Sequence, residues 1–425
     1  MIWLDTREKN FEKKFSVLLK NRASFKSELE QKVREIFSWV EKQGINALLD
    51  FVRRYEGFKG TSKDLKVKQK EIEQAEKKLT GKQIKAIKLA KNRIEKFHKR
   101  QIPKGYKIKE QDGYLEERWV ALSRVGIYIP AGKAPLASTV LMTGVPAKLA
   151  GVKEIIITTP AGKDGKVHPA ILFCAQLLGI KEIYKVGGAQ AIACLALGAE
   201  PIKKVDKIVG PGGVWVSSAK VYAQSQGLCG IDTLAGPSEI LILSDGSVRI
   251  EFAQADLFAQ LEHGEDSWAF LISANQKYLE RLISPELKGA KNLVLIYAES
   301  ENQMLELANQ IAPEHLELHL ENPEEALPHL STPPAIFIGG YSPVAIGDYL
   351  AGPNHSLPTG GRARFDSPLG VRDFMKRQSI VKIGKILFKE LSDPLSTFVE
   401  LEGLSAHSRS IKIRLKNCSR KRLPL

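Results

Sequence analysis

The stretch EIIITTPAGKDGKVHPAILFCAQLLGIKEIYKV, residues 154–186, decides the fold class of this chain. Residues 154–158 and 182–186 are short runs rich in β-branched residues, which are typical of buried strands. Residues 169–178 between them have the apolar content of a buried helix. A strand, a helix and a second strand within about 30 residues make one βαβ unit, which joins parallel strands. This stretch therefore predicts part of a parallel sheet.

The same alternation continues on both sides of this unit. Further strands are expected at 125–129, 207–209 and 239–243, and helices at 140–150, 189–197 and 214–226. A second series follows, with strands at 269–273, 293–297 and 335–338 and helices at 252–261, 276–282 and 300–311. The sequence therefore predicts an α/β protein with two Rossmann-like parallel sheets.

Both ends of the chain are expected to be helical. Residues 24–100 show apolar residues spaced among charges, as in surface helices. Beyond a glycine-rich loop at 339–370, the tail at 374–411 returns to helix-like spacing. The Rossmann-like part is thus expected to carry small helical N- and C-terminal segments.

The composition excludes several classes of protein. A chain of 425 residues with 43% hydrophobic content has room for two or three cores. Its first 20 residues lack the apolar run of a secretory signal, and no 18-residue apolar stretch free of charges occurs, so we expect no membrane span and a cytoplasmic location. Four scattered cysteines without a C-x-x-C pair argue against a disulfide framework and a thiolate zinc site.

The net charge of +15 is concentrated near the N-terminus. Residues 1–110 hold 30 Lys and Arg against 15 Asp and Glu, whereas the remaining residues are balanced. Lysines spread around helices, without interleaved aromatic residues, are typical of a solvated face. We therefore expect no nucleic-acid partner, although a basic, non-catalytic nucleic-acid-binding protein remains the alternative from another functional class.

The run IAPEHLE, residues 311–317, places a carboxylate beside an imidazole just after a helix-like segment. Glu314 and His315 could act as a general acid/base pair, since histidine as a residue type titrates near neutral pH. A solvent-facing glutamate beside a structural histidine is the simpler reading of the dipeptide alone. The pair becomes a candidate site only together with other residues.

Three residues could supply metal ligands. Gln260 and His263 stand at i and i+3 near the end of a predicted helix, so both side chains can reach one metal ion. Asp348 precedes a polar, glycine-rich loop that contains His355, and could complete an O/N ligand set suited to Zn²⁺ or Mn²⁺. By spacing alone, a chance pair and a turn or capping aspartate are equally good explanations.

Two glycine-rich turns, at 186–190 and 209–213, each follow a predicted strand and precede a predicted helix. Their backbone amides could hold a phosphate at the helix N-terminus. Neither turn is the G-x-G-x-x-G dinucleotide fingerprint, and ordinary tight β-to-α turns explain them equally well.

Taken together, the motifs closely resemble those of the histidinol dehydrogenase family. They occur in collinear order over about residues 120–410: RVGIYIP (124–130), PLASTVLMTGVPAKLAG (135–151), VGGAQAIA (186–193), VDKIVGPG (205–212), AGPSE (235–239), the segment 255–267, APEHLEL (312–318), GDY (347–349), NHSLPTGG (354–361) and EGLSAH (402–407).

This resemblance implies an activity and an architecture. It implies zinc-dependent oxidation of L-histidinol to L-histidine through L-histidinal, with one Zn²⁺ per subunit and two NAD⁺, in the last steps of histidine biosynthesis. It also implies an intertwined homodimer. The implied division is a helical N-terminal segment at 1–23, a metal-binding and catalytic Rossmann-like domain at 24–126 and 240–370, a Rossmann-like NAD domain at 127–239, and a helical tail at 371–425 that reaches the partner subunit.

The resemblance assigns a role to each candidate residue. The zinc ligands would be Gln260, His263, Asp348 and His407, the last of them supplied by the partner subunit. Glu314 and His315 would be catalytic: His315 would serve as base in both oxidations, and Glu314 would activate water against the aldehyde. Substrate contacts would come from these six residues together with Ser238, His355 and Glu402.

The family's NAD⁺ positions fall on Tyr128, Gln190 and Gly213. Gly213 departs from the family pattern, which usually has Asn there. The missing amide removes a hydrogen bond of about 1 kcal/mol, so the effect on cofactor affinity and choice is left open. The nearest rival activity is the oxidation of another small alcohol, such as a sulfonated diol, by a relative of this family. The native metal, the kinetic constants, the domain motions and the role of the lysine-rich N-terminal region do not follow from the sequence.

Overall fold

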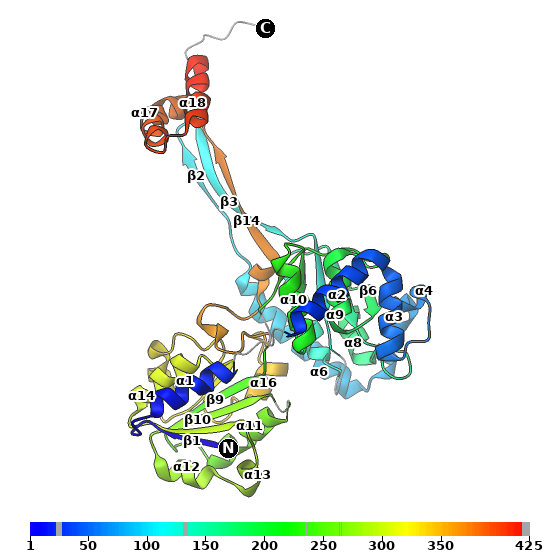
Figure 1. Cartoon of the computed structure of the whole chain (residues 1–425), viewed down its shortest axis with the longest axis vertical. Helices are drawn as coiled ribbons and strands as arrows, with labels where there is room; N and C mark the ends of the chain where they lie inside the picture. The colour runs from blue at the N-terminus through cyan, green and yellow to red at the C-terminus, as the bar shows by residue number, and fades with distance from the viewer. Residues whose placement is uncertain (23–27, 131–134, 234–235, 263, 265, 419–425) are drawn as a thin grey trace. The chain divides into compact units, whose positions relative to one another are not determined.

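The computed structural model describes residues 1–22, 28–130, 135–233, 236–262, 264 and 266–418. The chain forms two compact units. The first comprises Met1–Ile102 and Leu122–Phe374, and the second Pro103–Ala121 and Met375–Leu425. Each unit is described by itself (Figure 1).

A six-stranded parallel sheet forms one half of the first unit. Its strands run in the order β1 (Ile2–Asp5), β11 (Leu293–Tyr297), β10 (Trp268–Ser273), β9 (Glu239–Ser244), β12 (His315–His319) and β13 (Ile336–Ile338). Apolar residues of α1 (Phe11–Arg22) and α14 (Glu301–Ile311) join one core cluster with strand residues, and those of α11 (Ile250–Leu261) and α12 (Gln276–Leu282) join another. Strands covered by helices on both faces are continuous apolar runs, as ILIL at 240–243 illustrates.

A five-stranded parallel sheet forms the other half of this unit. Its order is β6 (Glu182–Lys185), β5 (Glu154–Thr159), β4 (Arg124–Tyr128), β7 (Lys207–Val209) and β8 (Gly230–Ile231). Helices α7 (Ala137–Leu149), α8 (Pro169–Leu177), α9 (Gly188–Leu197) and α10 (Val214–Ser225) connect these strands. Both sheets have a doubly wound strand order. Successive strands are added first on one side of the starting strand and then on the other, and the switch lies between β4 and β7 in one sheet and between β9 and β12 in the other. The predicted parallel α/β architecture is confirmed.

Strand β12 is absent from the sequence prediction. Its residues, HLELH, contain two histidines and a glutamate, and all five are buried. A strand with polar side chains lacks the apolar run that marks its neighbours. Pairing with β9 and β13 in the sheet decides its conformation.

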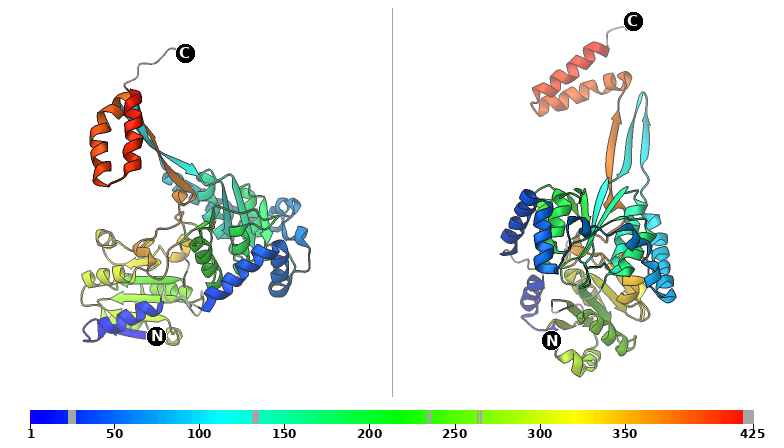
Figure 2. Two further views of the ribbon diagram at one scale, coloured as in Figure 1. Left: turned by 45° about the horizontal axis from the view of Figure 1, so that its top comes forward. Right: turned by 90° about the vertical axis from the view of Figure 1, so that its right-hand side faces the viewer.

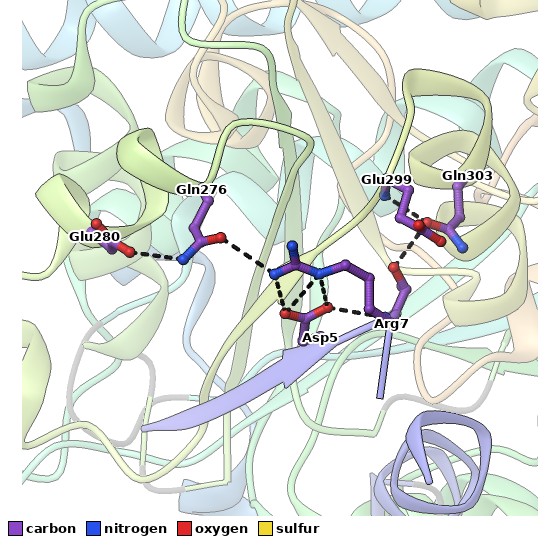
Figure 3. A network of polar contacts seen from close by, with 7 residues as sticks. Asp5, Arg7, Gln276, Glu280, Glu299 and Gln303 are labelled. Atoms are coloured by element: carbon purple, nitrogen blue, oxygen red, sulfur yellow. Dashed lines mark hydrogen bonds and ion pairs between the residues drawn. The ribbon is translucent and has the colours of Figure 1, made fainter. Parts of the chain in front are cut away.

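The N-terminus also differs from the helical segment expected over 1–23. Residues 2–5 pair with β11 as an edge strand, and the helix begins only at Phe11. Figure 3 shows how the end of this strand is tied down: Arg7 bonds Asp5 and Gln276 of α12, and Thr6 donates to Gln303 of α14. These contacts fix the start of the chain beside helices almost 300 residues away.

Helices α2 (Glu28–Gln43) and α3 (Ile45–Glu56) pack differently from the expected grouping, which joined residues 24–126 to the domain of residues 240–370. Their apolar residues, among them Val33, Phe37 and Leu48, share one core cluster with Ile192 of α9 and Ile208 of β7. Helix α6 (Gly81–His98) packs on α7. The sequence pattern did not show which of the two sheets these helices cover, because that choice depends on tertiary contacts.

The second unit corrects the expected helical tail at 374–411. Its strands β2 (Tyr106–Glu110), β3 (Gly113–Ala121) and β14 (Met375–Lys382) form an antiparallel sheet, followed by α17 (Lys385–Leu401) and α18 (Ser405–Cys418) (Figure 2). Both Asp112 carboxylate oxygens, in the β2–β3 turn, accept from the first turn of α17, at Ile386 and Leu387. The two-residue turn consists of Gln111 and Asp112, because Gly113 already pairs with Glu110 at the start of β3.

The remaining helices are short. They are α4 (Ser62–Leu65), α5 (Gln69–Glu73), α13 (Pro285–Lys288), α15 (Pro323–Ala326), α16 (Val344–Tyr349), and the 3₁₀ turns η1 (Glu76–Lys78), η2 (Lys99–Gln101), η3 (Leu327–His329), η4 (Arg362–Arg364) and η5 (Val371–Phe374). Among the residues that the structure describes, no helix combines the length and apolarity that crossing a bilayer requires.

Candidate active site

A cavity of about 360 Å³ in the first unit is the candidate site. On one side it is lined by the segments that follow β4 and β7, at the carboxyl edge of the five-stranded sheet and at its switch point, where doubly wound folds bind ligands. On the other side stand residues at the amino ends of β9 and β12. Its lining includes Pro130, Thr139, Gly210–Gly213, Ser238, Gln260, Glu314, His315, Asp348 and His355.

A two-residue turn presents the catalytic candidates to this cavity. Helix α14 ends at Ala312, whose φ of 47° is left-handed, and Pro313 prevents the helix from continuing. Among the described residues, Ala312 is the one non-glycine with positive φ. The chain then enters β12, which places Glu314 just before that strand and His315 at its first position.

Glu314 is buried and held by two donors. The Ser238 hydroxyl donates to its Oε2 at 2.8 Å, and the Glu239 backbone N–H donates to the same oxygen at 3.0 Å. Burial raises the pKa of this carboxyl, while His315 and the two hydrogen bonds oppose the rise. A carboxylate whose pKa is raised is a better proton acceptor, which suits a general base.

His315 is oriented by a single backbone contact. Its Nδ1 lies 3.0 Å from the Glu239 carbonyl oxygen, which can only accept, so Nδ1 carries the proton in that bond. The second nitrogen, Nε2, is then the basic atom of the neutral ring. The Glu314 Oε2 lies 3.6 Å from Nδ1.

Two of the predicted metal ligands meet at the cavity. Gln260, on the last turn of α11, is buried with its Nε2 lacking a hydrogen-bond partner, and Asp348 lies on α16. His263 lies outside the described residues. An amide and a carboxylate beside one small cavity form part of an O/N donor set, so the residues present fit a zinc site.

His355 is also brought to the cavity, as the sequence predicted. Its Nδ1 lies 3.0 Å from the Asp348 carbonyl oxygen, and its Nε2 lies 3.4 Å from the Thr139 hydroxyl. Burial lowers the pKa of this imidazole, although Asp348 opposes the shift. The neutral ring is therefore favoured, with Nε2 available as an acceptor.

The predicted cofactor residues Tyr128 and Gln190 lie together, but neither lines the cavity. The Tyr128 hydroxyl accepts from the Gly188 N–H at 3.1 Å at the start of α9. The carboxylate of Glu56, which the sequence analysis missed, accepts from the Gly187 N–H at 2.9 Å and lies 3.5 Å from the Gln190 amide. The Gly187 N–H of this turn thus already donates to a carboxylate, and the Gly188 N–H donates to the Tyr128 hydroxyl.

The other glycine turn does line the cavity. Gly210 donates to Asp232 Oδ2 at 2.7 Å and its carbonyl accepts from Lys220 at 3.0 Å, while Lys220 and Asp232 form a buried ion pair. Gly213 has φ −64°, and a Cβ there would meet nothing within 4 Å. The backbone at 213 therefore does not require glycine, and a side chain could extend from it.

Glu402 and His407 belong to the second unit. Glu402 follows the last turn of α17, His407 lies in the first turn of α18, and both are exposed. Their roles as substrate contact and metal ligand therefore stay predictions.

A separate group of potential ligands lies beneath the site. Asp256 of α11 and Glu317 and His319 of β12 offer ligand atoms within 4.8 Å of one another. One Glu317 oxygen accepts from the Val344 N–H at the start of α16, at 2.9 Å. This contact gives the group a visible role in holding the helix that carries Asp348.

Two parallel sheets of doubly wound order, with a buried carboxylate–imidazole pair where their ends meet, define an α/β protein with a candidate acid–base site. The histidinol dehydrogenase family model matches residues 19–415. The chain therefore belongs to the histidinol dehydrogenase family, as an enzyme of that family.

Individual relatives agree with this assignment. The histidinol dehydrogenase of Geobacter sulfurreducens is 41% identical over 98% of this chain and 100% of its own length. That of Clostridium acetobutylicum is 41% identical over 95% and 96%. The crystal structure of histidinol dehydrogenase from Elizabethkingia anophelis superimposes with a TM-score of 0.91 at 33% identity, covering 99% of both chains.

Proposed function

We propose that this protein oxidises L-histidinol to L-histidine through L-histidinal, with zinc and two NAD⁺, in the last steps of histidine biosynthesis in the cytoplasm. One observation carries the proposal: a single small cavity of a chain in this family is lined by the expected catalytic pair, two expected metal ligands and two expected substrate contacts.

The donor set supports zinc. Gln260, His263 and Asp348 would hold the ion together with His407 of the partner subunit. The buried Gln260 amide, whose nitrogen lacks a protein partner, is consistent with a side chain oriented by its oxygen toward a ligand. Bound there, zinc would hold the substrate through its nitrogen atoms and orient the carbinol carbon, which is a template role.

His315 would act first. Because its Nδ1 donates to the Glu239 carbonyl, its Nε2 is free to take the hydroxyl proton of histidinol as a hydride leaves for NAD⁺. The products of this step are the aldehyde, NADH and a protonated His315, whose charge the nearby Glu314 carboxylate stabilises.

Glu314 would act in the second oxidation. It would take a proton from the water that attacks the aldehyde carbon, while the protonated His315 gives its proton to the aldehyde oxygen, so that the hydrate forms and His315 becomes neutral again. His315 would then take a hydroxyl proton of the hydrate as a second hydride leaves for NAD⁺, which gives the carboxylic acid. Ser238 fixes the orientation of the Glu314 carboxylate for this role.

A homodimer would complete each site. Helix α17 exposes large apolar side chains on its surface, namely Ile386, Leu391, Leu395, Phe398 and Leu401. Such a patch is typical of a face covered by another subunit. We propose that the tail at 371–425 packs on the partner subunit and delivers Glu402 and His407 to its cavity, with NAD⁺ on the side of residues 127–239 and the metal on the side of residues 240–370.

The stoichiometry of NADH formation tests this function. Purified, zinc-loaded protein should form two NADH per L-histidinol consumed, and chelation should abolish turnover until zinc is restored. A sulfonated diol should not be oxidised at a comparable rate. No turnover of histidinol with either NAD⁺ or NADP⁺, in a dimer with stoichiometric zinc, would refute the proposal.

A further inference from the structure

Arg22 is a buried arginine that the roles described above do not use. It is the last residue of α1 and has 5% of its surface exposed. Arginine is seldom buried unless its charge is paired, because the desolvation cost is high. Lys20, on the same helix, is exposed, so the burial of Arg22 reflects specific contacts rather than the environment of the whole helix.

The guanidinium group contacts both sides of the turn that carries the catalytic pair. Its Nη2 donates to the Ile311 carbonyl at 2.5 Å, and its Nε lies 3.2 Å from Glu239 Oε1. Ile311 is the last residue of α14, where helix carbonyls lack intrahelical partners. Arg22 therefore links the helix end that precedes Glu314 to the strand that faces His315.

Glu239 in turn makes both backbone contacts of the catalytic pair. Its N–H donates to Glu314 Oε2, and its carbonyl oxygen accepts from His315 Nδ1. Its side chain also accepts from the Gly360 N–H at 3.2 Å. A displacement of Glu239 would thus disturb the orientation of Glu314 and the tautomer of His315 together.

The position of Glu239 depends on Arg22 because the Glu239 side chain lies between a negative charge and a positive one. Burial raises the pKa of Glu239, Arg22 opposes the rise and the Glu314 carboxylate adds to it, and the net pKa is about 7. Two buried carboxylates so close together repel each other when both are ionised. Arg22 offsets that repulsion and keeps an ionised Glu239 in place.

We infer that Arg22 is a positioning residue for the catalytic pair, acting through Glu239 and Ile311. Through these contacts it holds the Glu239 backbone where it orients Glu314 and fixes the Nδ1–H tautomer of His315. The inference rests on the proposed function only for the chemical roles of those two residues.

The test compares four variants with the wild type. Arg22→Met removes the charge and the hydrogen bond to Ile311 but approximately keeps the length of the side chain. Arg22→Lys keeps the charge but cannot form both contacts with a planar fork. The double variant Arg22→Met/Glu239→Gln also removes the Glu239 charge that the loss of Arg22 leaves unpaired. Lys20→Met is the matched control on the exposed face of α1.

Kinetics on folded dimers give the first readout. Arg22→Met should lower kcat about 10- to 100-fold with KM for NAD⁺ within about twofold, because the cofactor side is untouched. Arg22→Lys should be intermediate, the double variant should recover at least about fivefold over Arg22→Met, and Lys20→Met should match the wild type. A purely stabilising role would instead lower the melting temperature and leave kcat per folded molecule unchanged.

The second readout needs no substrate. In ¹⁵N NMR spectra of histidine-labelled protein, with His315 assigned from His315→Asn, the wild type should show a protonated Nδ1 and an unprotonated Nε2. Arg22→Met should populate the other tautomer. Wild-type kcat and a wild-type spectrum in folded Arg22→Met would overturn the inference, and if that variant does not fold, the same result in Arg22→Lys would. A wild type that does not oxidise histidinol refutes the proposed function alone, since the spectra still decide the role of Arg22.

Discussion

Adjacent residues of one dipeptide are placed in different environments. Glu314 accepts from a hydroxyl and a backbone N–H, whereas His315 donates to a backbone carbonyl. The first arrangement holds a carboxylate ready to accept a proton, and the second leaves one imidazole nitrogen basic. This difference supports a division of labour between the two side chains.

Glu314→Gln should separate the two oxidations. We expect oxidation of added L-histidinal to fall at least about 100-fold, as for loss of a general base, and oxidation of L-histidinol to the aldehyde to fall less than about tenfold. Single-turnover measurements of NADH in each half-reaction check this. Glu306→Gln, on the exposed side of α14, is the control, and equal losses in both half-reactions would contradict the assigned roles.

Gly213→Asn should strengthen cofactor binding. The position borders the cavity, and a Cβ there meets no atom within 4 Å, so the new amide can reach a ligand without strain. One added hydrogen bond of about 1 kcal/mol predicts a KM for NAD⁺ about fivefold lower, with kcat little changed. An unchanged or higher KM would show that the amide does not reach the cofactor.

Asp256 should make stability depend on pH. Burial, and secondly the Glu317 carboxylate, raise the pKa of Asp256 to about 7. The protonated form is favoured in the folded state, so its contribution is complete below the ordinary pKa near 4 and is lost as pH rises through about 7. Asp256→Asn should remove this loss, which we expect to be on the order of 2 kcal/mol. Urea unfolding from pH 5 to 8 measures it, and parallel curves for variant and wild type would exclude the effect.

At the scale of elements, strand β12 connects the catalytic pair to helix α16. His315 begins the strand, and two residues later Glu317 accepts from the Val344 N–H that starts the helix. Helix α16 ends with Asp348 and Tyr349, both at the cavity. The helix that carries the predicted metal ligand Asp348 is therefore held by Glu317, a residue outside the cavity lining.

Replacing Glu317 should weaken metal binding indirectly. Glu317→Gln keeps an oxygen for the Val344 N–H, whereas Glu317→Met removes it, and both remove the charge. We expect zinc affinity to be about 10-fold lower in the Met variant than in the Gln variant, as is typical when a supporting contact of a metal ligand is lost. Competition with a chromophoric chelator measures this, and equal affinities would mean that the contact does not position Asp348.

At the scale of the whole molecule, the predicted site residues are divided between the two units. The cavity belongs to the first unit, whereas Glu402 and His407 stand exposed on the second. Exposed ligand-type residues next to a large apolar surface are expected where a second subunit supplies the rest of a site. This arrangement suits the proposed exchange of tails between subunits.

Subunit mixing tests that exchange. His407→Ala and His315→Ala homodimers should each be almost inactive, but a mixed dimer contains one cavity with His315 and a partner tail with His407. We expect mixing to restore up to about a quarter of wild-type activity, because half of the dimers are mixed and each holds one intact site. Mass spectrometry must confirm subunit exchange; no recovery despite exchange would place His407 at the cavity of its own chain.

Local patterns were sufficient for much of this protein. Apart from β8 and β12, the strands from residue 124 to 338 and the longer helices between them follow from periodicity, because strands buried on both faces are apolar runs and the helices between them are amphipathic or apolar. The catalytic dipeptide, Gln260, Asp348, Ser238 and His355 carry ordinary ligand and acid–base chemistry, and family motifs located them. The cavity gathers all of these residues.

The sequence by itself thus determined the βαβ alternation and the family, and it predicted the catalytic pair and other site residues that the cavity brings together. Only the tertiary structure decided that β12 is a strand, that β14 pairs with β3, and that Arg22 is buried beside Glu239. These features depend on contacts between residues up to almost 300 positions apart, and periodicity reports only on neighbours. A charged side chain such as Arg22 can be buried only beside a partner of opposite charge, and the sequence does not show which residue folding brings there.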